Sequence, residues 1–131
     1  MQTEYVCIFF CAEERVVKYG DTVTLRCKAV SNIDVKWTQT DTRSHIYRIF
    51  TDGAIFRNIR DRFSRISTEP GEYNLRMIRA NPSDAGLYVC DEQSGRSRAR
   101  TVLSQYNLTI PSKLYLYFFV LLLLSLLLLC K

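Results

Sequence analysis

The side chains in this sequence that could carry out chemistry are five cysteines, one histidine and a few neighbouring acidic residues. A lone histidine such as His45 is more often an ordinary surface residue than a catalyst or a ligand. Cys7 and Cys11 lack partners at the spacing of a zinc site, and no glycine-rich phosphate loop is present. The acidic pair Asp91 and Glu92 falls in a predicted loop and is interpreted as solvated charge. We therefore expect no enzyme, no cofactor and no metal site.

The five cysteines differ in their surroundings. Cys7 and Cys11 lie in an apolar N-terminal stretch, and Cys130 lies at the end of a hydrophobic tail. Only Cys27 and Cys90 fall inside segments with the alternation of a β-strand. Two well-separated strand cysteines suggest a disulfide, and disulfides persist in oxidising compartments.

Short alternating segments between turn signals make up most of the chain before residue 114. In the segment 21–27, Val23, Leu25 and Cys27 share one face, while the polar residues between them share the other. Similar alternation marks residues 34–39, 46–50, 73–78, 87–90 and 106–110. This pattern is typical of an all-β fold.

The last stretch of the chain has a different character. Residues 114–130 are uncharged and apolar, interrupted only by Ser125, with a lysine on each side. As a helix they would span roughly 25 Å, slightly less than a hydrocarbon core of about 30 Å. We predict a single transmembrane helix with a minimal tail within residues 112–131. A signal that is replaced by a glycolipid anchor remains an alternative.

The first twelve residues are predicted to be a short or truncated signal-like segment. Their apolar core is short, and no basic residue precedes it. Since a disulfide-bonded domain must enter the secretory pathway, either the signal is weak or the true start is missing. We favour the second explanation, and we expect one domain over residues 13–111.

A set of residues in the middle of the chain resembles the variable-type (V-set) domains of the immunoglobulin superfamily. The set consists of Cys27, Trp37 and the run 84–90, which reads DAGLYVC. The resemblance implies a two-sheet antiparallel sandwich in which Cys27 and Cys90 are bridged and Trp37 packs on the bridge. It also implies that Tyr88 bonds back to the preceding corner, with Leu25 and Leu75 in the core.

Two further features extend or limit the resemblance. Arg62, in the run DRFS, is expected to pair with Asp84 at the base of the sandwich. The last strand lacks the aromatic-Gly-x-Gly bulge of antigen-receptor domains, which argues against receptor-style pairing of two variable domains. The sequence is more similar to a vertebrate cell-surface immune receptor or ligand than to an antibody chain.

Binding is the function class that these observations favour. In V-set domains three loops meet at one end of the sandwich, here residues 29–33, 52–58 and 92–99. The third carries Arg96, Arg98 and, just beyond it, Arg100, and arginine is enriched in interface hot spots. We predict that these arginines bind an acidic or sialylated partner. A second candidate surface is the exposed sheet face with His45, Tyr47 and Gln39.

The predicted location is the plasma membrane, with the domain outside the cell. Asn107 begins the sequon NLT and is predicted to carry a glycan. The net charge of +5 arises from basic residues scattered along strands, and without a nucleic-acid module we expect no nucleic-acid partner. The predicted partner is a cell-surface protein or glycan. The alternatives are an accessory subunit of a multichain receptor, formed by homo- or heterodimerisation through the sandwich, or a glycolipid-anchored adhesion protein.

Overall fold

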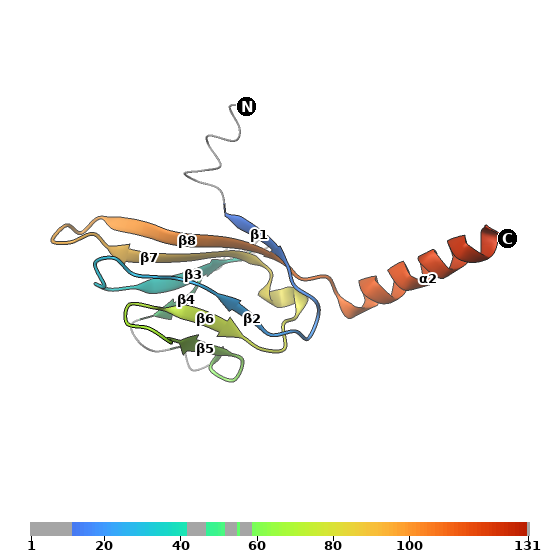
Figure 1. Ribbon diagram of the computed structural model, residues 1–131, viewed down its shortest axis with the longest axis horizontal. Coiled ribbons are helices and arrows are strands. Elements are labelled where there is room, and N and C mark those ends of the chain that lie inside the picture. Colours follow the sequence, from blue (N-terminus) through green and yellow to red (C-terminus); the bar gives the residue numbers. More distant parts are fainter. Residues whose placement is uncertain (1–11, 42–46, 52–54, 56–58, 131) are drawn as a thin grey trace, which may run out of the picture.

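The structure, a computed structural model, describes residues 12–41, 47–51, 55 and 59–130 of the chain. In that part, two sheets pack face to face, and a helix extends from one end of the sandwich (Figure 1). The elements are β1 (Glu13–Val16), β2 (Val23–Leu25), β3 (Lys36–Thr40), β4 (Tyr47–Thr51), β5 (Phe63–Ile66), β6 (Asn74–Met77), the 3-10 helix η2 (Pro82–Asp84), β7 (Gly86–Gln93), β8 (Arg100–Thr109) and α2 (Lys113–Leu129).

The five-stranded sheet has the order β1-β8-β7-β3-β4, and the three-stranded sheet has the order β2-β6-β5. The expected sandwich is therefore confirmed. Its antiparallel character has one exception, because β1 runs parallel to β8, with Glu13 opposite Tyr106. We call the end at which β8 stops and α2 begins the basal end, and the opposite end the distal end.

Strand alternation builds the core. Along β7 the buried residues are Gly86, Tyr88, Cys90 and Glu92, and the residues between them are half-buried. Each fully buried leucine such as Leu25 contributes about 1.5–3 kcal/mol of hydrophobic stabilisation. The buried apolar cluster comprises Val17, Leu25, Cys27, Val35, Trp37, Ile59, Phe63, Leu75, Met77, Ala80, Tyr88, Cys90, Tyr106, Leu108 and Ile110.

The start of β7 requires a glycine. Gly86 has φ of +139°, and a Cβ at this position would lie 2.3 Å from the carbonyl oxygen of Thr40 on β3. Any side chain would therefore push β3 and β7 apart. The glycine lets the two central strands of the larger sheet stay in contact at the basal end.

The C-terminal helix α2 extends away from the sandwich (Figure 1). It has 17 residues, and the described apolar side chains from Tyr117 to Leu129 are exposed. None of the helices in the described part of the chain combines the length and apolar character needed to cross a membrane. The helix agrees with the predicted one in place, and its membrane-crossing role stays a prediction.

Candidate recognition site

The disulfide that joins the two sheets organises the inside of the domain. Cys27 follows β2 and Cys90 lies on β7, with an S–S distance of 2.04 Å and a Cα–Cα distance of 6.4 Å. Trp37 lies opposite Cys90 on β3 and donates from Nε1 to the carbonyl of Tyr73 at 2.6 Å. The predicted bridge is thus confirmed, and the indole beside it has its polar atom satisfied.

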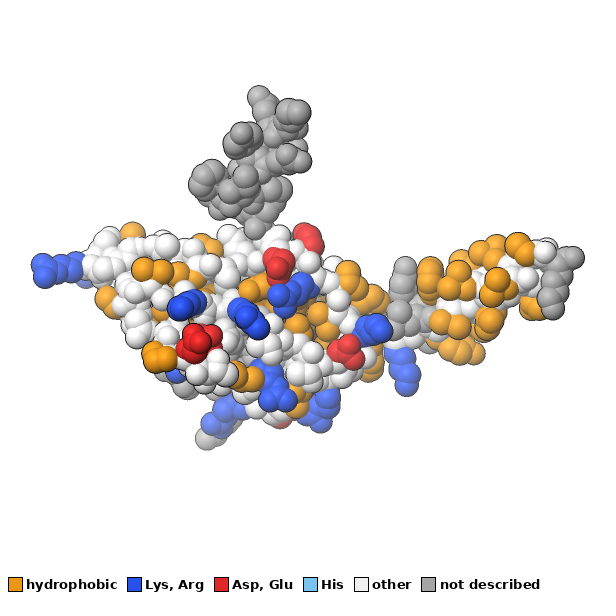
Figure 2. Space-filling view, viewed as in Figure 1, with side chains coloured by type: hydrophobic (Ala, Val, Ile, Leu, Met, Phe, Trp, Pro, Cys, Tyr) orange, Lys and Arg blue, Asp and Glu red, His pale blue; other side chains and the backbone are white. Residues whose placement is uncertain are grey.

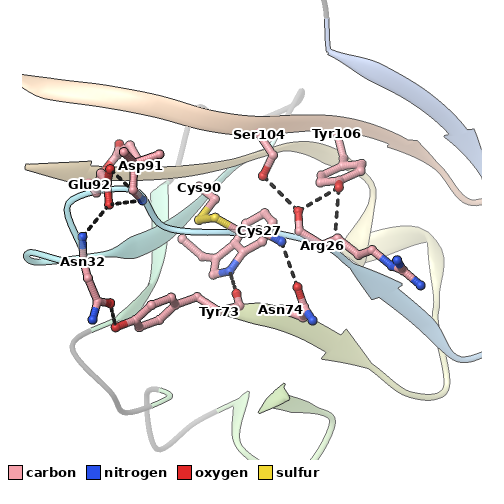
Figure 3. Close-up of a disulfide and its surroundings, with 12 residues drawn as sticks. Arg26, Cys27, Asn32, Tyr73, Asn74, Cys90, Asp91, Glu92, Ser104 and Tyr106 are labelled. Carbon is pink, nitrogen blue, oxygen red and sulfur yellow. Dashed lines mark hydrogen bonds between the residues drawn. A yellow bond between two sulfur atoms is a disulfide. The ribbon is translucent and has the colours of Figure 1, made fainter. Parts of the chain in front are cut away.

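Buried polar groups fasten the second sheet to this bridge (Figure 3). Asn74 Oδ1 accepts from the backbone N–H of Cys27 at 2.9 Å. The hydroxyl of Tyr106 accepts from the N–H of Arg26 at 3.1 Å and donates to its carbonyl at 2.7 Å. Arg26 directly follows the edge strand β2, so the Tyr106 hydroxyl pairs backbone groups of Arg26 that have no strand beside them.

The basal corner contains a fully buried carboxylate. Asp84 accepts from Arg62 Nη1 at 2.6 Å and Nη2 at 2.8 Å, and from the backbone N–H of Asn81 at 3.0 Å. The carbonyl of Asp84 accepts from the hydroxyl of Tyr88 at 2.6 Å. The hydrogen bond to Asp84 holds the pKa of Arg62 above its ordinary value. The structure thus brings Arg62, Asp84 and Tyr88 together in one network, while Leu25 and Leu75 lie in the core.

A second buried carboxylate shapes the distal end. Glu92, near the end of β7, accepts from three consecutive backbone N–H groups of the β2–β3 loop, those of Val30, Ser31 and Asn32, at 2.9–3.2 Å. Figure 3 shows the carboxylate within the curve of this loop, with dashed lines to the loop backbone. The sequence interpretation of Glu92 as a solvated loop residue is wrong. Glu92 lies two residues after Cys90 on the same face of an unbroken strand, so its side chain points inward.

The distal loop is also fixed by other contacts. The backbone N–H of Gln93 donates to the carbonyl of Ile33 at 2.9 Å, and Ser31 Oγ donates to the carbonyl of Gln93 at 2.5 Å. Tyr73 donates its hydroxyl to the Asn32 side chain. Asn32 and Asp34 have positive φ values of 60° and 48°, a conformation that costs free energy in residues other than glycine. The surrounding bonds offset that cost and hold the loop in one shape.

The ionisation of Glu92 is coupled to this loop. Burial raises the pKa of its carboxyl group, but the hydrogen bonds from Ser31, Asn32 and Val30 outweigh burial and lower the pKa below its ordinary value. A carboxylate with a lowered folded-state pKa stabilises the fold above its unfolded pKa, about 4.3. That stabilisation is lost as the pH falls through the folded-state pKa.

We expect Glu92→Gln to lower the free energy of unfolding by about 2 kcal/mol at pH 7, because the amide replaces an acceptor with a donor facing backbone N–H groups. The difference from the native chain should shrink as the pH falls below about 4. Urea titrations at several pH values would measure it. Glu69→Gln, at an exposed position, is the matched control, and a Glu92 difference that does not vary with pH would contradict the account.

Arg100 departs from its predicted role as a loop arginine. It is the first residue of β8, and it donates to Asp91 Oδ1 at 2.7 Å, to Asp34 Oδ2 at 2.7 Å and to the carbonyl of Asp34 at 2.5 Å. Partial burial lowers its pKa, but the bonds to both carboxylates raise it above the ordinary value. The predicted arginine triplet is therefore reduced to two, because Arg100 is occupied within the domain.

The remaining two arginines lie at the tip of the β7–β8 hairpin. Arg96 and Arg98 are exposed, in the loop of residues 94–99 that Figure 1 shows projecting beyond the rest of the sandwich. The neighbouring β2–β3 loop exposes two apolar side chains, Val30 at 86 % and Ile33 at 41 %. The distal end therefore presents cationic and apolar groups on a fixed backbone. The third loop predicted to join them, residues 52–58, lies almost wholly outside the described residues.

The second candidate surface is the outer face of β3, β4 and β7, which continues onto the neighbouring β8. Its central row is uncharged, with Thr38 opposite Val89 and Val89 opposite Gln105. Of the residues predicted here, His45 lies outside the described residues, as does the Tyr47 side chain. Gln39 is buried, which contradicts its predicted exposure. It shares the inner face with Trp37, two residues before it, and its Nε2 donates to the carbonyls of Asp84 and Ala85.

Asn107 lies at the basal part of this outer face. It is half-buried, and its Nδ2 donates to Glu14 Oε1 on β1 at 3.2 Å. It points away from the core, because its neighbours Tyr106 and Leu108 point inward. Nothing in the described residues groups three potential metal ligands together.

Two solved structures have folds that are similar to the fold of this chain. An extracellular fragment of Novel Immune-Type Receptor 11 from Ictalurus punctatus, including its stalk region, superposes with a TM-score of 0.60 and 21 % identity, over 78 % of this chain and 86 % of that one. Dpr1 IG1, in its structure bound to DIP-eta IG1, superposes with a TM-score of 0.56 and 18 % identity, over 76 % of this chain and 89 % of that one. At these identities the likeness shows the fold. No curated protein sequence matches the chain.

The sequence profile of the immunoglobulin V-set domain matches residues 12–109. That span begins just before β1 and ends with β8, so it contains both sheets, the disulfide and the distal loops. Domains of this type are typically extracellular or cell-surface recognition modules. The chain belongs to the immunoglobulin V-set domain family.

Proposed function

We propose that the chain is a membrane-held extracellular recognition module whose domain, residues 13–111, binds a cell-surface partner through its distal end. The observation that supports this best is the distal backbone, which Glu92 and Arg100 hold in one shape while Arg96, Arg98 and Val30 are exposed. Preorganised loops bind with less loss of conformational entropy than mobile loops. Arginine is among the residue types enriched in interface hot spots.

A protein partner fits this surface better than a glycan alone. An exposed valine at 86 % offers an apolar contact, and apolar contacts at the centre of an interface favour a protein. One structural relative, Dpr1 IG1, is bound to another IG1 domain in its solved structure. We therefore place a protein with acidic groups first and a sialylated glycan second.

Reversing the charge of the hairpin tests the proposal. We expect Arg96→Glu with Arg98→Glu to weaken binding of a multimerised ectodomain to partner-bearing cells by at least about tenfold, since hot-spot arginines each contribute more than about 1 kcal/mol. Arg26→Glu with Arg76→Glu makes the same charge change at two exposed positions of the smaller sheet and is the matched control. Equal binding by the two double variants would overturn the assignment of the site.

We also propose that α2 enters the lipid bilayer. Its exposed apolar side chains surround the helix, and the hydroxyl of Ser125 donates to the carbonyl of Leu121 at 3.0 Å. A polar group satisfied within its own helix costs less in lipid. A glycolipid anchor that replaces this segment is the second candidate, and phospholipase release of the chain from cells would favour it.

Asn107 is proposed to carry a glycan. We expect the chain made in a eukaryotic secretory pathway to lose one glycan on Thr109→Ala, because the sequon requires a hydroxyl at that position. Thr109→Ser keeps the sequon and should keep the glycan. Mass spectrometry before and after glycosidase treatment would measure both. If glycosidase treatment leaves the mass of the native chain and of both Thr109 variants unchanged, Asn107 is not glycosylated.

An accessory-subunit role is the alternative function. The uncharged row of Thr38, Val89 and Gln105 on the outer face supports it, since assembly surfaces carry few charges at their centre. A monomeric ectodomain at high concentration would favour partner recognition. A stable dimer that Val89→Glu dissociates would favour assembly.

A further inference from the structure

The helix α2 starts very close to the folded domain. Ile110, the first residue after β8, is buried in the core, and α2 begins at Lys113. Only Pro111 and Ser112 intervene, so three Cα steps separate the domain from the helix. Such a connection spans at most about 11 Å. The basal end of the sandwich must therefore stay beside whatever surface α2 enters.

The basal loops next to this connection are fixed by backbone hydrogen bonds. The N–H of Val17 donates to the carbonyl of Thr109 at 2.9 Å, just before the chain leaves β8. The N–H of Gly20 donates to the carbonyl of Ala80 at 2.7 Å, and the N–H of Ala80 donates to the carbonyl of Asp21 at 3.0 Å. The β1–β2 loop and the segment after β6 therefore form one rigid rim around the start of α2.

This rim, residues 16–21 with Arg79 and Lys113, exposes cationic and apolar groups together. Lys18, Arg79 and Lys113 are exposed, and Asp21 is the one exposed acidic residue among the rim's members. Tyr19 is 46 % exposed and Val16 is 77 % exposed. Figure 2 shows basic and apolar side chains gathered at the end from which the helix leaves.

The rest of the basal end adds little net charge near the rim. The exposed Arg60 and Asp61 carry opposite charges, and Asp41 at the end of β3 is half-buried. A depression of about 500 Å³ is formed in part by the rim residues Val16, Val17, Lys18 and Asp21, with Glu14 and Arg15 of β1 also lining it. Its lining combines side chains of both charge signs with valine side chains.

We propose that the rim rests on the phosphate-bearing headgroups of the bilayer that α2 enters, so that the domain has a fixed orientation on the membrane. This inference depends on the proposed entry of α2 into lipid. Tyrosine prefers the membrane interface, where its ring is partly buried and its hydroxyl stays wet. Lysine and arginine side chains next to a helix that enters lipid extend to the headgroup region, where the lipid phosphates attract them. The fixed rim presents both kinds of side chain at the height that the short connection sets.

Quenching of an introduced indole by brominated lipids tests this orientation. The only native tryptophan, Trp37, is buried in the sandwich and serves as an internal reference. The full chain with Tyr19→Trp is reconstituted into vesicles of brominated phosphatidylcholine with or without phosphatidylserine. The chain with Val30→Trp, altered at an exposed position of the distal end, is the matched control.

We expect the brominated lipids to quench Tyr19→Trp emission, more strongly with phosphatidylserine, and to leave the Val30→Trp and native chains nearly unchanged. Adding Lys18→Glu and Arg79→Glu to Tyr19→Trp should reduce the contact by more than about fivefold, whereas adding Arg26→Glu and Arg76→Glu should leave it nearly unchanged. Equal quenching of the Tyr19→Trp and Val30→Trp chains, while the chain floats with the vesicles, would overturn the orientation alone. A chain that does not float with vesicles would overturn the lipid entry of α2 and this inference with it.

Discussion

Replacing Cys27 and Cys90 together with alanine lowers the free energy of unfolding by about 4 kcal/mol, according to the chain-entropy estimate for the loop that they close. The two cysteines are 63 residues apart, so the bridge removes many conformations from the unfolded chain. A urea titration of the full chain in detergent, followed by the fluorescence of Trp37, measures the change. A loss of this size is comparable with the whole stability of a small domain, about 5–15 kcal/mol.

A cysteine of the described residues that lies outside the sandwich provides the control for this prediction. Cys130, an exposed free thiol after α2, should be replaceable by alanine without a change in the unfolding midpoint. Treating the native chain with a reductant in urea should move its midpoint to that of the double variant. A native midpoint that does not respond to reductant would show that the bridge contributes little to stability.

Removing the buried carboxylate at the basal corner should have the second-largest effect. We expect Asp84→Ala to lower the free energy of unfolding by about 3 kcal/mol, because the partly buried Arg62 guanidinium and the N–H of Asn81 lose the fully buried carboxylate that accepts from them. Arg62→Ala should also be destabilising, since it leaves the fully buried Asp84 carboxylate without its two guanidinium donors. Thermal or urea unfolding of the variants measures both effects.

A double variant separates what the Arg62–Asp84 ion pair contributes to the free energy of unfolding from the cost of leaving one buried partner unpaired. Arg62→Met with Asp84→Leu removes both charges and keeps apolar volume, and replacements of this kind are often nearly neutral. The double variant should therefore be more stable than Asp84→Ala alone. If it is as unstable as the single variant, the corner depends on the bond that the Asn81 N–H donates to the Asp84 carboxylate, because Tyr88 can still donate to the backbone carbonyl of residue 84 in both variants.

The sequence predicts well those parts of the fold in which apolar side chains alternate with polar ones and must therefore be buried. Alternation places Cys27 and Cys90 on the apolar faces of their segments, the V-set resemblance implies Trp37 beside their bridge, and all three residues are buried. Leu25 and Leu75 follow from the same alternation. The V-set family resemblance adds the sheet pairing, which alternation alone does not determine.

The parts that sequence reasoning misses are polar residues whose surroundings are non-local. Gln39 and Glu92 have the parity of the core residues two positions before them, Trp37 and Cys90, and extending each strand by one step predicts their burial. The face on which Glu92 lies does not reveal its hydrogen-bond partners. The N–H groups that donate to it belong to a loop about 60 residues away in the chain. The pairing of Arg100 with Asp34 is equally distant.

Because Glu92 holds the β2–β3 loop by its backbone, the backbone path of that loop does not depend on the identity of most of its side chains. The carboxylate contacts main-chain N–H groups, which every residue except proline has. The Val30 side chain is thus free to vary without altering the path of the backbone beneath it. Relatives or engineered versions that keep the glutamate could exchange that tip for another and acquire a new target on an unchanged scaffold.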